Sequence, residues 1–233
     1  SSAASDVYKR QEGWFAEYSG FDPGYHTLTI SCLARIYELN PSEKLKSIIT
    51  KAVELAGQFI HPDGSFGGEY ASRNTYNFFP HGFELVGKWL PTTLWINDQF
   101  LIGLKNGLAP CYADDHIIGH HTWNYLLAWR DFVTERPIDT SRDVASVWLK
   151  EAQLLIKRRP GVELYVSLNK GGVFKLFRNQ KLVASDTHSS LQVSKGKKIL
   201  NAVSHLSGNY YVKIFQDEIV ISGDMGWAKQ TQM

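Results

Sequence analysis

Hydrophobic and polar residues follow two different periods along this chain of 233 residues, and the change falls near Trp148. Before Trp148, apolar residues recur three or four positions apart, which is the spacing of one buried face of an α-helix. After it, apolar and polar residues alternate in short runs such as VELYVSL and YYVKIF, which is typical of strands with one buried face. The pattern predicts helices first and strands second.

Two of the predicted helices have clear start signals. Asp22-Pro23 precedes a helical stripe that ends near Leu39, and Pro41-Ser42-Glu43 caps a second helix whose apolar stripe runs over residues 45–60. Further helices are predicted at residues 80–88, 92–104 and about 115–132, with glycine or proline between them. Helices joined by such short turns pack as antiparallel pairs.

The C-terminal runs are separated by turn sequences, among them Lys170-Gly171-Gly172, Asn179-Gln180 and Ser207-Gly208-Asn209. About seven or eight short strands in succession favour an antiparallel sandwich over alternating strand–helix units. We therefore predict an α+β chain of more than one domain. Helices occupy residues 12–147, and a β-sandwich that the end of the sequence cuts short occupies residues 148–233.

Residues 1–11, SSAASDVYKRQ, resemble the in-frame translation of a transposase-type sequencing adapter. We expect them to be an artefact of an environmental gene fragment and to be disordered. On this interpretation the natural N-terminus is missing, together with any targeting signal or site residue that it carried.

Composition narrows the possible partners. Lys and Arg number 25 and Asp and Glu 23, so the formal net charge of +2 gives no support to a nucleic-acid or membrane surface. The apolar runs are short and interrupted, and no membrane-spanning helix is predicted. Cys32 and Cys111 show neither paired nor metal-type spacing, and we expect both to be free thiols.

Functional chemistry concentrates in residues 63–84, DGSFGGEYASRNTYNFFPHGFE. The stretch lies between predicted helices, where a polar loop is more often a site than a plain connection. Its glycines allow the backbone to turn tightly. Its amide, cationic, phenolic and imidazole side chains suit the removal of a proton from a sugar acid.

Two segments carry a family resemblance: EGWFAEYSGFDPGYHTLTISCLA and HPDGSFGGEYASRNTYNFFPHGFE. Through them the chain resembles the heparinase II/III-like proteins, relatives of the chondroitin AC and alginate lyases, over residues 12–226. The resemblance implies the C-terminal part of an α/α toroid joined to an antiparallel β-sandwich. It also implies a polysaccharide lyase that acts on an acidic polysaccharide or oligosaccharide, without a cofactor, in the periplasm or outside the cell.

The resemblance also implies roles for individual residues. β-Elimination needs a neutralised uronate carboxylate, a base for the C5 proton and an acid for the departing oxygen. Asn74 would neutralise the carboxylate, His81 would be the base, and Tyr70 or Tyr76 the acid. Further substrate contacts are expected from Arg73, Glu69, Trp14, Glu17, Tyr25, His120 and His121.

Each of these roles has a structural alternative. Asn74 can cap the turn, and Arg73 can form an internal salt bridge with Glu69. His81 follows a proline at a predicted helix start, where it can be a packing residue. The tyrosines of the loop can belong to an aromatic core.

A second polar segment, YADDHIIGHHTWNY, raises the question of a metal site. His116 and His120 lie four residues apart and would share a helix face, as two zinc ligands do, with Asp114 and Asp115 close by. The Glu of an HExxH motif is absent, and Gly119 weakens the helix. We therefore predict no metal.

Two other functions stay open. One is a non-catalytic glycan-binding or polysaccharide-assembly protein of the same fold. The other is a glycoside hydrolase that uses two carboxylates, for which Asp63, Glu69 and Asp115 are candidates.

Overall fold

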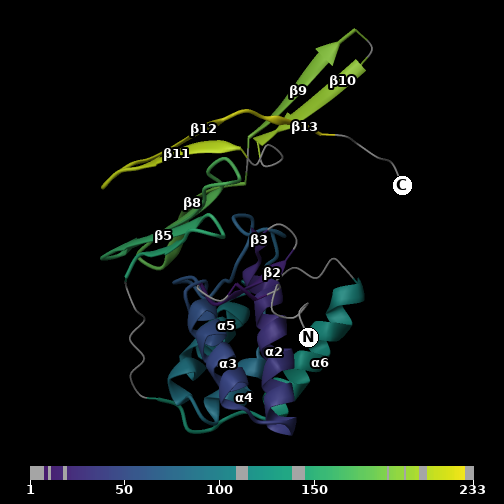
Figure 1. Ribbon diagram of the computed structural model, residues 1–233, viewed down its shortest axis with the longest axis vertical. Helices are drawn as coiled ribbons and strands as arrows, with labels where there is room; N and C mark the ends of the chain where they lie inside the picture. The colour runs from purple at the N-terminus through teal and green to yellow at the C-terminus, as the bar shows by residue number, and fades with distance from the viewer. Residues whose placement is uncertain are drawn as a thin grey trace. The chain divides into compact units, whose positions relative to one another are not determined.

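The computed structural model describes residues 8–9, 12–17, 20–108, 115–137, 145–187, 189–196, 198–204 and 209–228. The chain forms two compact units, which divide between Asp143 and Val144 (Figure 1). In its described residues, unit 1 is helical apart from three short strands, and unit 2 consists of antiparallel strands. The predicted α+β mixture is confirmed, and the three short strands that precede the first helix were not predicted.

The first helices of unit 1 begin where the sequence supplies caps. The Asp22 carboxylate accepts the Tyr25 N–H at 3.0 Å, and the Ser42 hydroxyl oxygen accepts the Leu45 N–H at 3.3 Å. Both bonds satisfy an N–H that the helix itself leaves without an acceptor. The helices of the described residues are α2 (Pro23–Leu39), α3 (Glu43–Gly57), α4 (His81–Gly87), the 3-10 helix η1 (Pro91–Thr93), α5 (Leu94–Lys105) and α6 (Asp115–Arg130).

The short helix α4 contacts α2, α3, α5 and α6, and all of its residues are buried. Phe78, which precedes it, stacks on Phe83 and on Phe100 of α5 with ring centroids 5.0 and 4.2 Å away. Helix α4 also touches α2 closely, since a Cβ on Gly82 would lie 2.7 Å from the Cα of Ser31. Burial of the aromatic rings and the close contact of α4 with α2 at Gly82 therefore fix α4 in place.

Three short strands precede α2 and form one antiparallel sheet in the order β1-β2-β3. Disorder was expected for residues 1–11, but Tyr8 and Lys9 form a strand that pairs with Phe15 and Trp14. Residues 1–7, 10 and 11 lie outside the described part of the chain. The strands are β1 (Tyr8–Lys9), β2 (Trp14–Glu17) and β3 (Gly20–Phe21).

Unit 2 contains a five-stranded sheet in the order β4-β5-β6-β7-β8, a three-stranded sheet β13-β10-β9 and the hairpin β11-β12. Asn179 and Gln180 make the turn between β7 and β8 with φ of 48° and 65°, as their sequence predicts. The strands are β4 (Val147–Leu149), β5 (Leu154–Arg159), β6 (Val162–Ser167), β7 (Phe174–Arg178), β8 (Lys181–Asp186), β9 (Ser190–Lys195), β10 (Lys198–Val203), β11 (Tyr210–Ile214), β12 (Ile219–Gly223) and β13 (Gly226–Ala228).

One core of unit 2 lies between the five-stranded sheet and the hairpin β11-β12. Leu155, Val166 and Leu168 are buried there. Strand β8, at the edge of the large sheet, is exposed along its whole length. The side chains that pack against the buried three are Leu164, Phe174, Val212, Ile214, Ile219 and Ile221.

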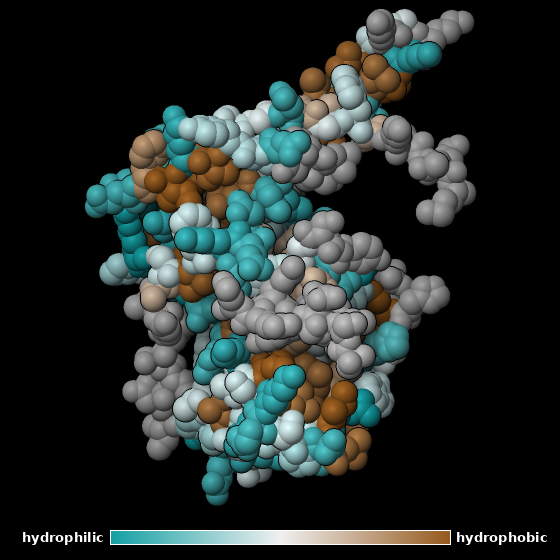
Figure 2. Space-filling model, in the orientation of Figure 1, coloured by the Kyte–Doolittle hydropathy of each residue, from teal (hydrophilic) through white to brown (hydrophobic). Residues whose placement is uncertain are grey.

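Apolar side chains also lie on the surface (Figure 2). In unit 1 they include Leu39 of α2 and Trp129 of α6, which are 88% and 79% exposed. Among the helices described, none is both long enough and apolar enough to span a membrane. Cys32 is a free, exposed thiol, and Cys111 lies outside the described residues.

Candidate functional site

Residues 58–80 connect α3 to α4 and carry five of the eleven predicted site residues, namely Glu69, Tyr70, Arg73, Asn74 and Tyr76. Gly64, Gly67 and Gly68 have φ of 87°, 61° and 118°, a range that favours glycine. Asp63 closes the turn by accepting the N–H and the O–H of Ser65 at 2.9 and 2.7 Å. The DGSFGG turn is therefore held by local backbone geometry, and the Asp63 carboxylate takes part in holding it.

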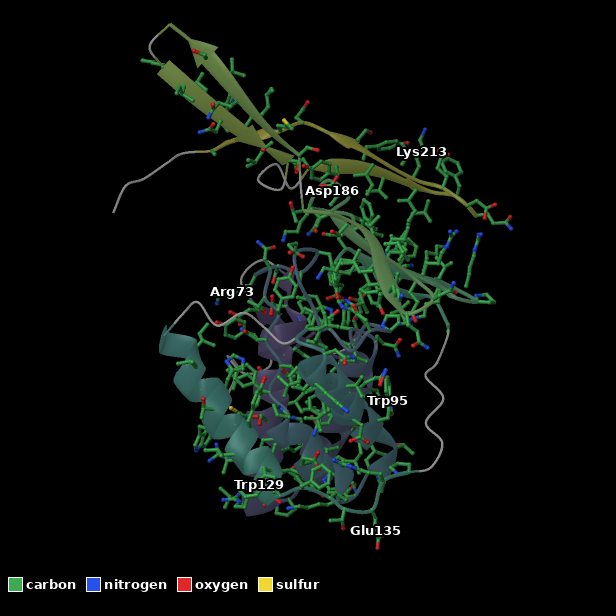
Figure 3. All side chains as sticks on the ribbon, turned by 180° about the vertical axis from the view of Figure 1, so that it is seen from behind. Arg73, Trp95, Trp129, Glu135, Asp186 and Lys213 are labelled. Carbon is green, nitrogen blue, oxygen red and sulfur yellow. The ribbon has the colours of Figure 1, made fainter. Side chains whose placement is uncertain are left out.

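Arg73, labelled in Figure 3, contacts one side chain from β2 and one from the first turn of α2. Its Nη1 donates to Glu17 Oε1 at 3.0 Å, and the guanidinium carbon lies 4.6 Å from the centre of the Tyr25 ring. The Arg73 and Glu17 side chains are 33% and 31% exposed, so solvent reaches both. Asn74 is exposed, with φ of 59°. We call Glu17, Tyr25, Arg73 and Asn74 the Arg73 cluster.

Tyr76 and Glu69 form a second polar contact on the same loop. The Tyr76 hydroxyl donates to Glu69 Oε1, and both residues are half-buried. The Gly68 N–H donates to the Thr75 carbonyl oxygen at 2.8 Å, so the two arms of the loop that carry Glu69 and Tyr76 are bonded to each other. Arg73 forms a salt bridge with Glu17, a partner that was not predicted from the sequence.

Two of the predicted site residues belong to the core instead of the surface. Tyr70, expected to be an acid, is 1% exposed, and its hydroxyl lies 2.9 Å from His61 Nε2. Trp14, expected to stack on a sugar, is 3% exposed and packs on Phe21 with ring centroids 5.9 Å apart. Both side chains are large and apolar enough that burial outweighs presentation to a ligand.

His81, the predicted base, is buried at the start of α4 with 2% of its side chain exposed. The ring nitrogen Nε2 lies 2.7 Å from Asp131 Oδ2. The backbone N–H of His81 donates to Asn124 Oδ1 at 2.9 Å. Burial lowers the pKa of His81, against the hydrogen bond and charge of Asp131, which raise it. The imidazole therefore ties α4 to the end of α6, and a substrate could reach it only if that contact opened.

Asp131 is the charged partner that makes this arrangement possible. A hydrogen bond from Arg130 is the largest of the effects that lower the pKa of Asp131 to about 2, and His81 contributes to the same shift. The Arg130 guanidinium donates to Asp131 Oδ2 at 2.7 Å. A carboxylate held in this way stays ionised and orients the neutral His81 ring.

The two remaining predicted contacts, His120 and His121, lie on different faces of α6. His120 is exposed, whereas His121 is 2% exposed and stacks on Phe79 with ring centroids 4.4 Å apart. Burial lowers the pKa of His121. Asp114 and the side chains of Asp115 and His116 lie outside the described residues, and among the residues described no group of three or more His, Cys, Asp or Glu is placed to hold a metal ion.

A buried ionic network around Glu84 was not foreseen from the sequence. Glu84 is fully buried, and its two oxygens accept bonds from Arg136 at 2.7 and 3.1 Å. The Val133 N–H donates to it at 2.9 Å, and Asn97 donates as well. The available signal was a single carboxylate in HGFELVG, a helix that is otherwise apolar apart from its first residue. A charge in such a position requires buried donors.

Cavities also lie away from the Arg73 cluster in the described part of the chain. One, of about 230 Å³, is beside Glu84 and Asn97 and is lined mainly by aromatic and leucine side chains, including Phe100, Tyr125 and Trp129. Trp129 and Arg73 lie toward opposite ends of unit 1 (Figure 3). Another cavity, of about 590 Å³, lies in unit 2 over strands β5 to β7, with charged side chains at its edge.

Comparison with protein-family models, with curated proteins and with solved structures found no match to this chain. The heparinase II/III-like family therefore remains a resemblance carried by the sequence segments quoted above.

Proposed function

We propose that this protein is a polysaccharide-lyase-like protein that binds a uronic-acid-containing glycan and cleaves it by β-elimination. The observation that carries the proposal is the Arg73 cluster, a solvent-reachable guanidinium beside Asn74 on a glycine-rich loop. The finer fold belongs to the same proposal: unit 1 as part of an α/α toroid and unit 2 as part of a β-sandwich. The antiparallel hairpin packed on the five-stranded sheet supports the second of these.

Recognition of the sugar acid would begin at Arg73. A guanidinium presents its N–H donors in a planar fork that fits a carboxylate. Glu17 and the Tyr25 ring hold it from two directions, so little side-chain freedom is lost on binding. Asn74 would add an amide hydrogen bond to the same carboxylate.

The elimination step would use Tyr76 and Glu69. As the C5–H bond breaks, its proton passes to the Tyr76 oxygen while the hydroxyl proton of Tyr76 passes to Glu69. Tyr76 then gives a proton to the glycosidic oxygen as the C4–O bond breaks, and the proton on Glu69 returns to Tyr76. The C5–H electron pair becomes the C4–C5 double bond, so protons and electrons balance.

The charge that develops on the substrate carboxylate would be stabilised by Arg73 and Asn74, which is worth about 3 kcal/mol per well-placed donor. In this assignment Tyr76 and Glu69 take the role first expected of His81, because His81 is buried against Asp131. A base must lie within hydrogen-bond reach of the proton that it removes.

The burial of His81 and Tyr70 favours a second candidate, a non-catalytic glycan-binding or polysaccharide-assembly protein. Such a protein needs the Arg73 cluster but no proton transfer. A glycoside hydrolase has less support, since the Asp63 carboxylate is bonded within its own turn.

Incubation with polygalacturonate, alginate and chondroitin tests the proposal through the ultraviolet absorbance of the unsaturated product. Tyr76→Phe should lower the rate by about a hundredfold or more while glycan binding persists. Arg73→Ala should weaken binding by roughly thirtyfold, the loss of about 2 kcal/mol expected for a charged hydrogen bond. The matched control is Arg159→Ala, which removes an exposed arginine from unit 2.

The outcomes separate the candidates. Binding that depends on Arg73 without any absorbance change supports the non-catalytic protein. New reducing ends without absorbance support hydrolysis. If the protein neither binds nor changes any of the three polymers, both glycan proposals are contradicted.

A further inference from the structure

The carboxylate of Asp22 is buried at the point where the Arg73 loop meets α2. The residue is 1% exposed, and its two oxygens accept four hydrogen bonds. Oδ1 accepts the Tyr25 N–H at 3.0 Å and the Thr75 hydroxyl. Oδ2 accepts the N–H groups of Arg73 and Thr75 at 3.2 and 3.4 Å. One carboxylate thus holds the helix start and the loop together.

These hydrogen bonds flank Asn74, whose backbone has the least favourable conformation of the turn. Asn74 lies between the two N–H groups that Asp22 Oδ2 accepts, and its φ is 59°. The left-handed region costs an ordinary residue roughly 1–2 kcal/mol, and asparagine tolerates it better than most. Fixing the N–H groups on both sides of Asn74 therefore selects this conformation. The same conformation sets the directions in which the Arg73 and Asn74 side chains leave the backbone.

The start of α2 and the loop at Thr75 are packed so closely that no side chain fits between them at Gly24. A Cβ on Gly24 would lie 2.3 Å from Thr75 Oγ1, so only glycine fits beside the Asp22–Thr75 bond. The Ser72 N–H donates to the Phe21 carbonyl oxygen at 3.0 Å, and the Ser72 hydroxyl donates to the Glu17 carbonyl oxygen at 3.0 Å. The loop is therefore bonded to the segment that carries Glu17 and Tyr25.

We infer that Asp22 is the positioning residue of the Arg73 cluster: its carboxylate sets turn 72–75 against the start of α2, and this arrangement directs Arg73 and Asn74 toward a glycan carboxylate. The inference rests on the proposed glycan-binding function. Helix capping alone does not account for the geometry, because a cap needs only the Tyr25 N–H, and the other three bonds go to the loop.

Asp22→Asn separates positioning from capping. Asparagine is as good an N-cap as aspartate, so its amide oxygen can still accept the Tyr25 N–H. Its NH₂ group then faces the N–H groups of Arg73 and Thr75, where a donor meets donors. We expect the turn to loosen and the affinity for oligogalacturonate, measured by calorimetry, to fall by about tenfold or more.

Three further measurements make the test specific. Combined with Arg73→Ala, Asp22→Asn should cause a smaller loss of affinity than it causes alone, because the part of its effect that acts through Arg73 is already gone. Ser42→Ala removes the cap of α3 and should lower stability without lowering affinity. Hydrogen exchange of the Arg73 and Thr75 amides should accelerate in Asp22→Asn and not in Ser42→Ala.

The inference and the proposed function fail in different ways. If the unmodified protein binds no uronate, the proposed function is contradicted, while the exchange of the Arg73 and Thr75 amides still decides whether Asp22 holds the turn. If the protein binds oligogalacturonate and Asp22→Asn binds equally well with unchanged exchange, Asp22 is only a helix cap. Additive losses of affinity in the double variant would also overturn the positioning role.

Discussion

Glu84 shows how single residues decide the stability of unit 1. The carboxylate has no contact with solvent and is bonded to Arg136, Asn97 and the Val133 N–H. An ion pair taken out of water is a weak source of net stability, yet removing one of its members is strongly destabilising because the other charge is left buried. Glu84 is therefore a sensitive position even though it lies outside the Arg73 cluster.

Glu84→Gln keeps the size of the side chain and removes its charge. We expect a loss of roughly 3 kcal/mol in the free energy of unfolding, since Arg136 loses a buried carboxylate. Urea unfolding measures the change. Glu38→Gln is the matched control: its bond to Lys88, at 3.0 Å, joins side chains that are about half exposed, and we expect a change below about 1 kcal/mol. Equal losses in the two variants would contradict this assignment.

His26 is a second residue whose burial has a measurable consequence. Its ring is buried, its Nε2 lies 2.8 Å from the Ala52 carbonyl oxygen, and burial lowers its pKa to about 4. The unfolded chain, with a pKa near 6.5, binds the proton first as the pH falls. Stability from this group is therefore fully present above about pH 6.5 and is lost as the pH falls toward 4.

The expected loss of stability at low pH follows from the difference between the pKa of His26 in the unfolded chain and in the folded protein. A change of about 2.5 pKa units corresponds to roughly 3 kcal/mol at about pH 4. His26→Gln can still donate to Ala52 and does not titrate, so its unfolding free energy should fall less than that of the unmodified protein between about pH 7 and pH 4. Burial lowers the pKa of His81 and His121 too, so only the difference between the two proteins reports on His26. Parallel pH profiles would show that His26 is not the titrating group.

At the scale of elements, helix starts and strand turns were predictable because their causes are local. The caps at Asp22 and Ser42 and the turn at Asn179-Gln180 are determined by residues within a few positions of one another. The burial of His81 was not predictable, because its partner Asp131 lies 50 positions away. Tyr70 was predicted to be an acid with a core residue as the alternative, and its burial against His61, nine positions away, follows from how the loop folds back on itself.

The candidate site shows the same division. The loop and its residue types were visible in the sequence, and the structure brings Arg73 to Glu17 and Tyr25 and pairs Tyr76 with Glu69. Which carboxylate would accept from Arg73 could not be read from spacing, since Glu69 is nearer in sequence than Glu17. Long-range pairing of charges depends on chain packing that no local pattern encodes.

The close packing of α4 against α2 can be tested by substituting Gly82 of α4, with Gly119 of α6 as the control. Gly82→Ala would place a Cβ 2.7 Å from the Cα of Ser31, so the helices must separate, and we expect a loss of roughly 1–3 kcal/mol. In Gly119→Ala the new Cβ meets no atom within 4 Å, and we expect a gain of up to about 1 kcal/mol from helix propensity. Thermal melting measures both. A stabilising Gly82→Ala would show that α4 is not held tightly against α2.

At the scale of the whole molecule, the two periods of the sequence correspond to two units with separate cores. Phe78 is fully buried in unit 1 among aromatic rings, and Phe177 is 1% exposed in unit 2 with its ring centroid 5.8 Å from that of Tyr165. Each core consists of residues from its own side of the division between Asp143 and Val144. Units that bury separate cores can unfold in separate transitions.

Calorimetry of the whole chain should therefore show two transitions. Phe78→Ala should lower the temperature of one, and Phe177→Ala that of the other, since each substitution removes roughly 3–5 kcal/mol of burial from a single core. The function proposed for unit 1 adds a further difference, because oligogalacturonate should raise only the transition that Phe78→Ala lowers. A single transition shifted by both substitutions would show that the two units unfold cooperatively, and a ligand shift confined to the Phe177 transition would place the glycan in unit 2.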